Sequence, residues 1–223
     1  MAGTFITFEG GEGAGKSTQI ERLRRFLEAE GHDVVVTREP GGSPRAEEIR
    51  AFILGGRAKD RGPVLETILF AAARLDHLDT TIRPALAAEK VVLSDRFADS
   101  TRAYQGASGG IESGLIEAIE RVTLDDTRPD LTFILDLPPE TGLARADKRR
   151  AGTGGPADRF EGEALAFHAS LREAFRSIAE REPGRCVLID ADRDADTVEA
   201  AIRTALLARL PHLAAPKDLR DAS

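Results

Sequence analysis

A glycine-rich segment, residues 10–17 (GGEGAGKS), follows an apolar run and precedes a helical pattern near the start of the chain. Glycines let several backbone N–H groups converge on one anion, and the N-terminal end of the next helix adds a positive field. In the spacing G-x-x-x-x-G-K-S the lysine can reach the β- and γ-phosphates of a nucleoside triphosphate, and the serine can bind Mg²⁺. The segment therefore predicts a strand, a phosphate-binding loop and a helix in this order. The residues expected around the phosphates are Gly10, Gly11, Glu12, Gly13, Ala14, Gly15, Lys16, Ser17 and Thr18.

The rest of the chain alternates short apolar runs with longer helical patterns. Continuous runs such as Val34-Val35-Val36 are typical of strands buried on both faces, as in a parallel sheet. Apolar residues at spacings of three and four, in residues 20–27 and 164–178, predict amphipathic helices. This alternation predicts an α/β domain whose ligands bind at the carboxyl ends of the strands. The expected strands are Thr4–Glu9, Asp33–Thr37, Lys90–Ser94, Leu131–Asp136 and Arg185–Asp190.

Length and composition narrow the class of protein. The 223 residues, with 31 basic and 38 acidic side chains and a net charge of −7, suit one compact domain, expected over residues 1–210 with a loose tail over 211–223. No apolar run approaches the roughly 18 residues that a membrane span needs, and no signal peptide is expected at the start. The single Cys186 cannot form an internal disulfide, which favours a reducing cytoplasm. The acidic balance argues against a nucleic-acid partner.

Polar residues directly follow two of the expected strands. Arg38 lies before a rigid Pro-Gly-Gly bend, where it either binds a second phosphate or is a surface residue at a turn. Asp95 and Arg96 end the third expected strand. An aspartate at this place commonly orients Mg²⁺, and an arginine neutralises phosphate, although a surface ion pair would give the same sequence.

Two further segments could recognise a base and its sugar. Phe70 and Arg74 are four residues apart in a helical pattern and share a face, so one could stack on a base while the other bonds its carbonyl edge. Taken alone, a core phenylalanine and a solvated arginine explain this pair better. In Ser100–Gly106, the ring of Tyr104 could pack on a sugar and the amide of Gln105 could read a base edge.

A flexible segment, Ala151–Pro156, interrupts the helical patterns. Residues 145–159 around it carry five basic and two acidic side chains within an acidic chain. It is either a solvated helix end and loop, which composition alone favours, or a mobile lid over about residues 145–160 that brings cations to an anion.

Together these segments resemble the thymidylate kinase family, whose members phosphorylate dTMP. The most specific matches are Thr37–Gly42 (TREPGG) and Ser100–Gly106 (STRAYQG). The matches run in the expected order from about residue 5 to residue 161. Further matches are Phe8–Gln19, Phe70–Arg74, Asp95-Arg96, Leu135–Glu140 and Asp158–Glu161.

The resemblance implies a P-loop nucleoside monophosphate kinase fold, with a five-stranded parallel sheet flanked by helices and a mobile lid. It implies a homodimer that transfers the γ-phosphoryl group of ATP to dTMP, with Mg²⁺, for dTTP synthesis. Glu12 would contact the 3′-hydroxyl side of the sugar, and Tyr104 would exclude a ribose 2′-hydroxyl. The expected catalytic residues are Lys16, Arg38, Asp95, Arg96, Arg149, Arg150 and Arg159. The expected substrate contacts are Glu12, Arg38, Phe70, Arg74, Arg96, Ser100, Tyr104 and Gln105, and the expected Mg²⁺ residues are Ser17 and Asp95.

One departure from the family pattern bears on the lid. Some family members carry an arginine in the phosphate loop where this chain has Gly13. In a branch typical of many bacteria the lid supplies the basic residues instead, and the basic cluster at 145–159 fits that arrangement, which reverses the preference for a solvated loop.

Two alternatives remain at this point. A kinase for another nucleotide or nucleoside would use the same loop and lid. A nucleotide-dependent switch is the second alternative, although no guanine-binding N-K-x-D run is present. The four histidines need no catalytic role, because an acceptor phosphate with a second pKa of about 6 is already mostly ionised near neutral pH.

Overall fold

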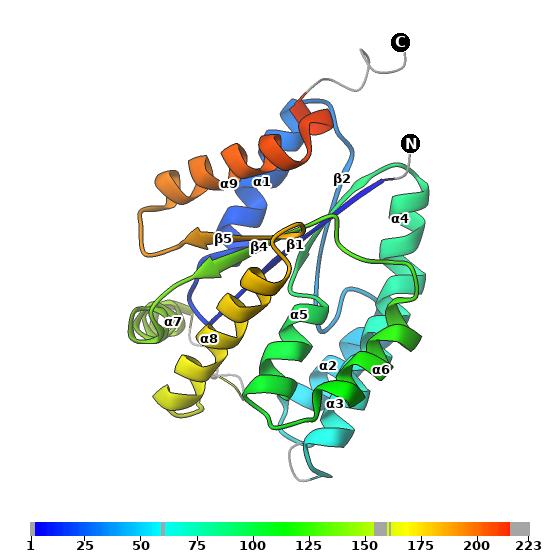
Figure 1. Cartoon of the computed structure of the whole chain (residues 1–223), viewed down its shortest axis with the longest axis vertical. Helices are drawn as coiled ribbons and strands as arrows, with labels where there is room; N and C mark the ends of the chain where they lie inside the picture. Colours follow the sequence, from blue (N-terminus) through cyan, green and yellow to red (C-terminus); the bar gives the residue numbers. More distant parts are fainter. Residues whose placement is uncertain (1–2, 59–60, 154–159, 161, 215–223) are drawn as a thin grey trace.

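The computed structural model describes residues 3–58, 61–153, 160 and 162–214. Its centre is a five-stranded, fully parallel sheet with the strand order β2-β3-β1-β4-β5 (Figure 1). The predicted α/β fold with five parallel strands is confirmed, and each strand lies within one residue of its expected bounds. The strands are β1 (Thr4–Gly10), β2 (Val34–Arg38), β3 (Val91–Asp95), β4 (Leu131–Asp136) and β5 (Cys186–Asp190).

Helices cover both faces of this sheet (Figure 1). Helices α1 (Lys16–Ala29) and α9 (Ala195–Arg209) pack together on one face, and α8 (Leu165–Arg181) lies against β4 and β5 on the other. No helix in the described ranges is both long and apolar enough to cross a bilayer. The remaining helical elements are α2 (Pro44–Leu54), α3 (Pro63–His77), η2 (Leu78–Ile82), α4 (Arg83–Ala87), α5 (Ala98–Thr101), η3 (Arg102–Ala107), α6 (Ser113–Leu124), α7 (Pro139–Thr153) and η4 (Pro211–Ala214).

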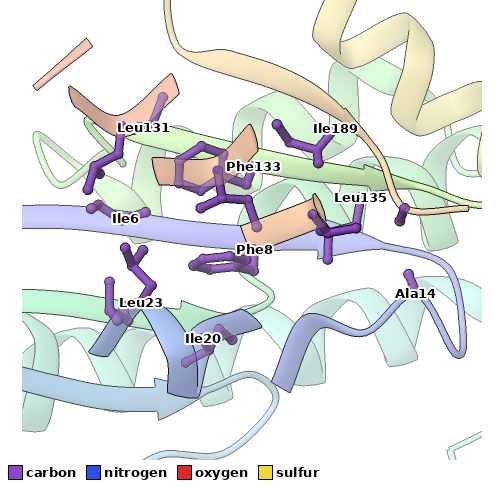
Figure 2. Close-up of a cluster of buried hydrophobic side chains, with 14 of the residues drawn as sticks. Ile6, Phe8, Ala14, Ile20, Leu23, Leu131, Phe133, Leu135 and Ile189 are labelled. Carbon is purple, nitrogen blue, oxygen red and sulfur yellow. The ribbon is translucent and has the colours of Figure 1, made fainter. Parts of the chain in front are cut away.

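The central strand β1 separates two cores by the alternation of its side chains. Ile6 and Phe8 are fully buried in the cluster beneath α1 and α9, together with Phe133 of β4 (Figure 2). Phe5 points to the other face and packs against Phe97. Each such buried side chain contributes about 1.5–3 kcal/mol relative to an exposed one.

The cluster beneath α1 and α9 also includes Ala14, in the middle of the glycine-rich loop. Ala14 is 4% exposed and lies near Leu135 at the end of the sheet (Figure 2). The loop that follows β1 is therefore attached to the main core by a side chain as well as by its two ends.

The valine run of β2 departs from the expectation that it is buried on both faces. Val36 is 46% exposed, and none of the five β2 residues is fully buried. The reason is topological, because β2 is an edge strand that pairs only with β3 in this sheet. The valines of β3 are buried as expected.

Two expected flexible segments begin later than the sequence indicates. Helix α7 continues through Ala151 and Gly152, because alanine favours a helix and one glycine near a helix end costs only about 1 kcal/mol. The tail expected from residue 211 starts with η4, in which Leu213 is 1% exposed and packs into the cluster beneath α1 and α9. The His32 ring also hydrogen-bonds the Leu213 carbonyl at 3.2 Å. Residues 215–223 lie outside the described residues.

Candidate active site

The glycine-rich loop turns sharply between β1 and α1. Gly13 and Gly15 have positive φ angles of 66° and 90°, a backbone conformation that side chains disfavour. A Cβ atom at Gly13 would also overlap the carbonyl oxygen of Gly142 in α7. This close approach explains why the position where some relatives of the expected family carry an arginine is a glycine in this chain.

Lys16 and Ser17 start helix α1 at the mouth of the loop. Lys16 Nζ donates to the carbonyl oxygens of Gly10 and Gly11, at 3.2 Å and 3.1 Å. Its side chain is almost fully buried, and burial together with the nearby Arg96 lowers the pKa of Lys16. A phosphate placed on the loop would offer this ammonium group a stronger acceptor than two carbonyl groups do.

The two residues expected to serve Mg²⁺ lie together. The hydroxyl of Ser17 donates to a carboxylate oxygen of Asp95 at 2.9 Å, which brings the start of α1 to the end of β3. A hydroxyl and a carboxylate are oxygen ligands of the kind that Mg²⁺ prefers. No cluster of three or more histidine, cysteine or acidic residues suited to a metal occurs among the described residues. The pair therefore fits a magnesium ion that takes its other ligands from water and phosphate.

Glu12 lies at the junction of the loop with the acceptor side. One carboxylate oxygen accepts from Arg96 Nη2 at 2.8 Å and from the Tyr104 hydroxyl at 3.0 Å. Arg96 also stacks over the Tyr104 ring, 4.9 Å from its centroid. Burial by itself raises the pKa of Glu12, but Arg96, Lys16, the Tyr104 hydroxyl and His168 together lower it by more than burial raises it, and the resulting pKa is about 2. Glu12 is therefore an acceptor-only carboxylate at neutral pH.

Arg96 is held in an unusual backbone conformation. Its φ angle is 72°, a region in which a residue with a side chain is strained and which is common at functional sites. Its guanidinium donates to the Gly10 carbonyl at 3.1 Å and to the Ser100 hydroxyl at 3.2 Å. These contacts fix Arg96 between the loop and helix α5.

Glu9 holds the segment around Arg96 in place through hydrogen bonds to Phe97 and Ser100. Glu9 was not identified as a site residue from the sequence. Its fully buried carboxyl group accepts from the Phe97 N–H at 2.8 Å and from the Ser100 hydroxyl at 2.6 Å. Burial and the nearby Asp99 raise the pKa of Glu9 to about 7, against the opposing effects of Arg96 and these hydrogen bonds. The one signal in the sequence that could have identified Glu9 is an acidic residue near the end of an otherwise apolar, buried strand.

Arg74 lines the site from α3 within a buried polar network that includes Glu39. Its Nε donates to Glu39 Oε2 at 2.7 Å, and its Nη2 donates to the Thr101 hydroxyl at 3.0 Å. Glu39 also contacts His77 Nδ1 at 3.1 Å, and His77 Nε2 lies 2.6 Å from the Thr37 hydroxyl. No role was assigned from the sequence to His77 or to Glu39, which lies within the TREPGG match, because their partners come from distant segments.

Gln105 and Tyr104 lie on η3, a short π-helical segment of the kind often found at functional sites. Gln105 is 4% exposed, and its amide nitrogen donates to Glu66 of α3 at 3.2 Å. Glu66 therefore fixes which way the Gln105 amide faces and is a further residue that the sequence did not single out.

A cavity of about 500 Å³ brings most of the expected residues together. It opens beyond the carboxyl ends of β1, β2 and β3, where ligands bind in open α/β sheets. The expected residues that line it are Glu12, Gly13, Ala14, Gly15, Lys16, Ser17, Thr18, Arg38, Phe70, Arg74, Asp95, Arg96, Ser100, Tyr104, Gln105 and Arg149. Gly10 and Gly11 line a smaller neighbouring cavity instead.

The basic residues of the expected lid differ in where they point. Arg149 of α7 lines the large cavity, whereas Arg150 forms an ion pair with Asp147 on the same helix. Arg38, 58% exposed, pairs with Glu47 at 3.1 Å at the rim of the cavity. Arg159 lies outside the described residues.

Comparison with known proteins assigns the family of this chain. The sequence profile of the family "Thymidylate kinase" matches residues 8–202. The chain belongs to the thymidylate kinase family. It is similar to the thymidylate kinase of Bradyrhizobium diazoefficiens, with 61% identity over 93% of this chain and 90% of the relative. It is also similar to that of Caulobacter vibrioides, with 58% identity over 93% and 98% of the two chains.

A solved thymidylate kinase gives the same fold. The crystal structure of the enzyme from Ehrlichia chaffeensis superposes with a TM-score of 0.75 at 31% identity, covering 92% of this chain and 100% of that one. These comparisons confirm the thymidylate kinase family that the sequence motifs predicted.

Proposed function

We propose that this chain is a dTMP kinase that transfers the γ-phosphoryl group of ATP to dTMP, giving ADP and dTDP. The observation that carries the proposal is that the phosphate loop and the acceptor residues line the same cavity of about 500 Å³. Lys16 and Ser17 line it from the start of α1, and Phe70, Arg74 and Gln105 line it from α3 and η3. In this family member, a donor on the loop and a nucleoside monophosphate on the acceptor side would meet beside Arg96 and Asp95.

The reaction needs positioning and charge neutralisation more than a base. The attacking group is a phosphate oxygen, which is already mostly ionised near neutral pH because its second pKa is about 6. Two phosphate groups must approach in line against their mutual repulsion. Lys16, Arg96 and Arg38 are placed in the cavity to offset that repulsion. Ser17 and Asp95 would hold Mg²⁺, and the ion would supply further positive charge to the phosphate groups of ATP.

Arg149 is the lid residue that we assign to the transferred phosphate. It lines the cavity in the described part of the chain, and no arginine is available at Gly13. A cation that meets the transferring group during closure stabilises the transition state, and such contacts are worth about 10³–10⁵ in rate in related chemistry.

The base and sugar would be read by residues held in fixed orientations. Phe70 would stack on thymine, while Arg74 and Gln105 would bond its polar edge, each oriented by a buried carboxylate. Glu12 would accept from the 3′-hydroxyl side of the sugar, and the buried Tyr104 ring would exclude a 2′-hydroxyl.

The test is ADP formation from ATP and Mg²⁺ with dTMP, dUMP, UMP, CMP, AMP and GMP offered separately. Strong and selective turnover of dTMP is expected. Turnover of a different monophosphate would keep the kinase and discard the base-reading residues. Slow ATP hydrolysis that no monophosphate changes would favour a nucleotide-dependent switch. Lys16→Ala, which removes the loop ammonium group, should abolish turnover in each case.

We also infer a homodimer formed through α3 and α6. These two helices are adjacent (Figure 1), and both carry exposed apolar side chains. Val64, Ile68 and Leu75 lie along one stripe of α3, and Val122 of α6 is 78% exposed. Ile68→Asp should convert a dimer to a monomer in light scattering, whereas Leu188→Asp on β5 should leave the dimer intact.

The chain is proposed to act as one catalytic unit over residues 1–210 in a reducing cytoplasm. All five strands belong to one sheet, and η4 extends that unit to residue 214. Cys186 is buried and free, and burial raises its pKa to about 12, so it stays a thiol.

A further inference from the structure

His168 is a buried polar residue that the proposed mechanism does not use. It lies in the first turn of α8, and its side chain is 5% exposed. Its Nε2 atom is fully buried, and no described residue provides it with a hydrogen-bond partner. Native structures rarely leave such an atom unsatisfied, so its surroundings need an explanation.

His168 lines a small cavity of about 20 Å³ beside the phosphate loop. The walls include Gly10, Gly11 and Glu12 on one side, and Leu143 and Phe175 on another. The volume exceeds the roughly 10–15 Å³ that one water molecule needs, and it is too small for a larger ligand. Among the lining residues, the backbone of Gly10–Glu12 and the unpartnered His168 Nε2 offer the polar groups that a buried water molecule requires.

Glu12 connects this small cavity to the large one, because it lines both. The His168 ring also interacts electrostatically with the Glu12 carboxylate and contributes to the lowered pKa of Glu12. The other two charged side chains at the small cavity, Arg172 and Asp136, hold each other through hydrogen bonds of 2.7 Å and 2.9 Å. His168 is therefore the group in this wall that is placed to act on the loop.

We propose that His168 is a positioning residue for Glu12, and that its Nε2 acts through one water molecule held in the small cavity against the segment Gly10–Glu12. The proposal rests on the proposed function, in which Glu12 contacts the sugar 3′-hydroxyl. It gives α8, which follows the lid segment in the sequence, a water-mediated polar link to the acceptor side of the site. The structural alternative is a core histidine that only fills space.

The test compares dTMP with its 3′-deoxy analogue as acceptors for the wild type and for His168→Phe. The wild type should prefer dTMP at least tenfold in kcat/KM. Phenylalanine fills the space of the ring without a polar atom, so the preference should fall about fivefold, through a higher KM for dTMP and with the KM for ATP unchanged. That loss corresponds to one hydrogen bond of about 1 kcal/mol. The kinetics of the 3′-deoxy analogue should not change.

Three further variants separate positioning from packing. His168→Gln keeps a polar atom in the cavity and should restore most of the preference. Phe175→Leu changes the packing of the same cavity without removing a polar atom, so it should lower the unfolding temperature and leave the preference intact. His168→Leu replaces His168→Phe should the larger ring prevent folding.

The outcomes distinguish this inference from the proposed function. A wild type that does not phosphorylate dTMP overturns the proposed function. A wild type that phosphorylates dTMP, with an equal preference in His168→Phe, overturns the role of His168. A high-resolution crystal structure of the wild type gives a readout without activity: electron density for a water molecule within hydrogen-bond distance of Nε2 is expected, and a dry cavity would overturn the proposal.

Discussion

Arg74 Nε donates to Glu39 Oε2 across 2.7 Å, and the two side chains are only 3% and 5% exposed. Glu39 follows the edge strand β2, whereas Arg74 lies on α3. The pair therefore fixes α3 relative to the sheet, and it orients the guanidinium group toward the cavity that we propose to hold thymine.

Replacing Glu39 by glutamine should damage both stability and acceptor recognition. Removing one partner of a buried ion pair leaves an uncompensated charge, so the free energy of unfolding should fall by about 3 kcal/mol. The KM for dTMP should rise at least tenfold while the KM for ATP changes little. Denaturant unfolding and steady-state kinetics measure the two effects. Glu21→Gln, which breaks an exposed pair with Arg24, is the matched control and should resemble the wild type.

The two neighbouring arginines of α7 should differ in their effect on turnover. Arg149 lines the cavity and Arg150 pairs with Asp147, so Arg149→Ala should lower kcat by about 10³-fold and Arg150→Ala much less. The affinity for dTMP should change little in either variant, because the contact is made during transfer. Equal kcat values for both variants and the wild type would show that the lid acts through another residue.

The free energy of unfolding should decrease as pH rises, because of Glu9. Its pKa is raised from 4.5 to about 7 by burial, so between these values the folded chain holds a proton that the unfolded chain has lost. The wild type should therefore lose stability as pH rises through this window, on the order of 3 kcal/mol, with little further loss from this group above pH 7. Glu9→Gln cannot titrate and should show a flatter curve. Parallel curves for the two proteins, measured by urea unfolding from pH 4.5 to 8, would contradict the assignment.

Two neighbouring glycines of the loop should respond differently to alanine. Gly13→Ala places a Cβ atom against the Gly142 carbonyl at a positive φ angle, so it should lower the unfolding temperature and weaken ATP binding. Gly11→Ala is the control, because a Cβ atom there meets nothing within 4 Å. Thermal unfolding and ATP titration of both variants check this, and equal losses would exclude the contact with α7 as the cause.

Tyr104 combines two functions that a pair of substitutions can separate. Tyr104→Phe removes the hydroxyl that holds Glu12 and should raise the KM for dTMP severalfold while the ring still excludes a ribose. Tyr104→Ala removes the ring as well and should relax the selection against ribonucleotides. The measurement is kcat/KM for dTMP and for its ribose counterpart. A similar deoxy-to-ribo ratio in all three proteins would rule out the steric role.

Much of the fold could be predicted because its signals are local. The phosphate loop, the five strands and the polar residues that follow them depend on short patterns, and parallel topology then brings the strand ends to one edge. The valines of β2 show the limit of this reasoning, since an edge strand and an interior strand have the same sequence pattern.

The supporting residues could not be predicted, because their partners are distant in the sequence. Glu9 contacts residues near position 100, Glu39 contacts α3, and Glu66 contacts η3. No periodicity encodes such pairs. In the sequence, His168 is one polar residue on a predicted amphipathic helix, and no pattern there indicates a role. The cavity that it lines is visible only in the structure.

The position of β1 in the middle of the sheet has a consequence for synthesis on the ribosome. The first strand to emerge pairs with β3 and β4, in which Thr4 faces Val91 and Ile6 faces Leu131. The two strands that pair with β1 are therefore synthesised long after it. The phosphate loop at the end of β1 is not held between both neighbouring strands until more than half of the chain has left the ribosome. Nascent chains that end before β4 should not retain ATP, whereas the ability to bind it should appear abruptly once that strand is free to pair.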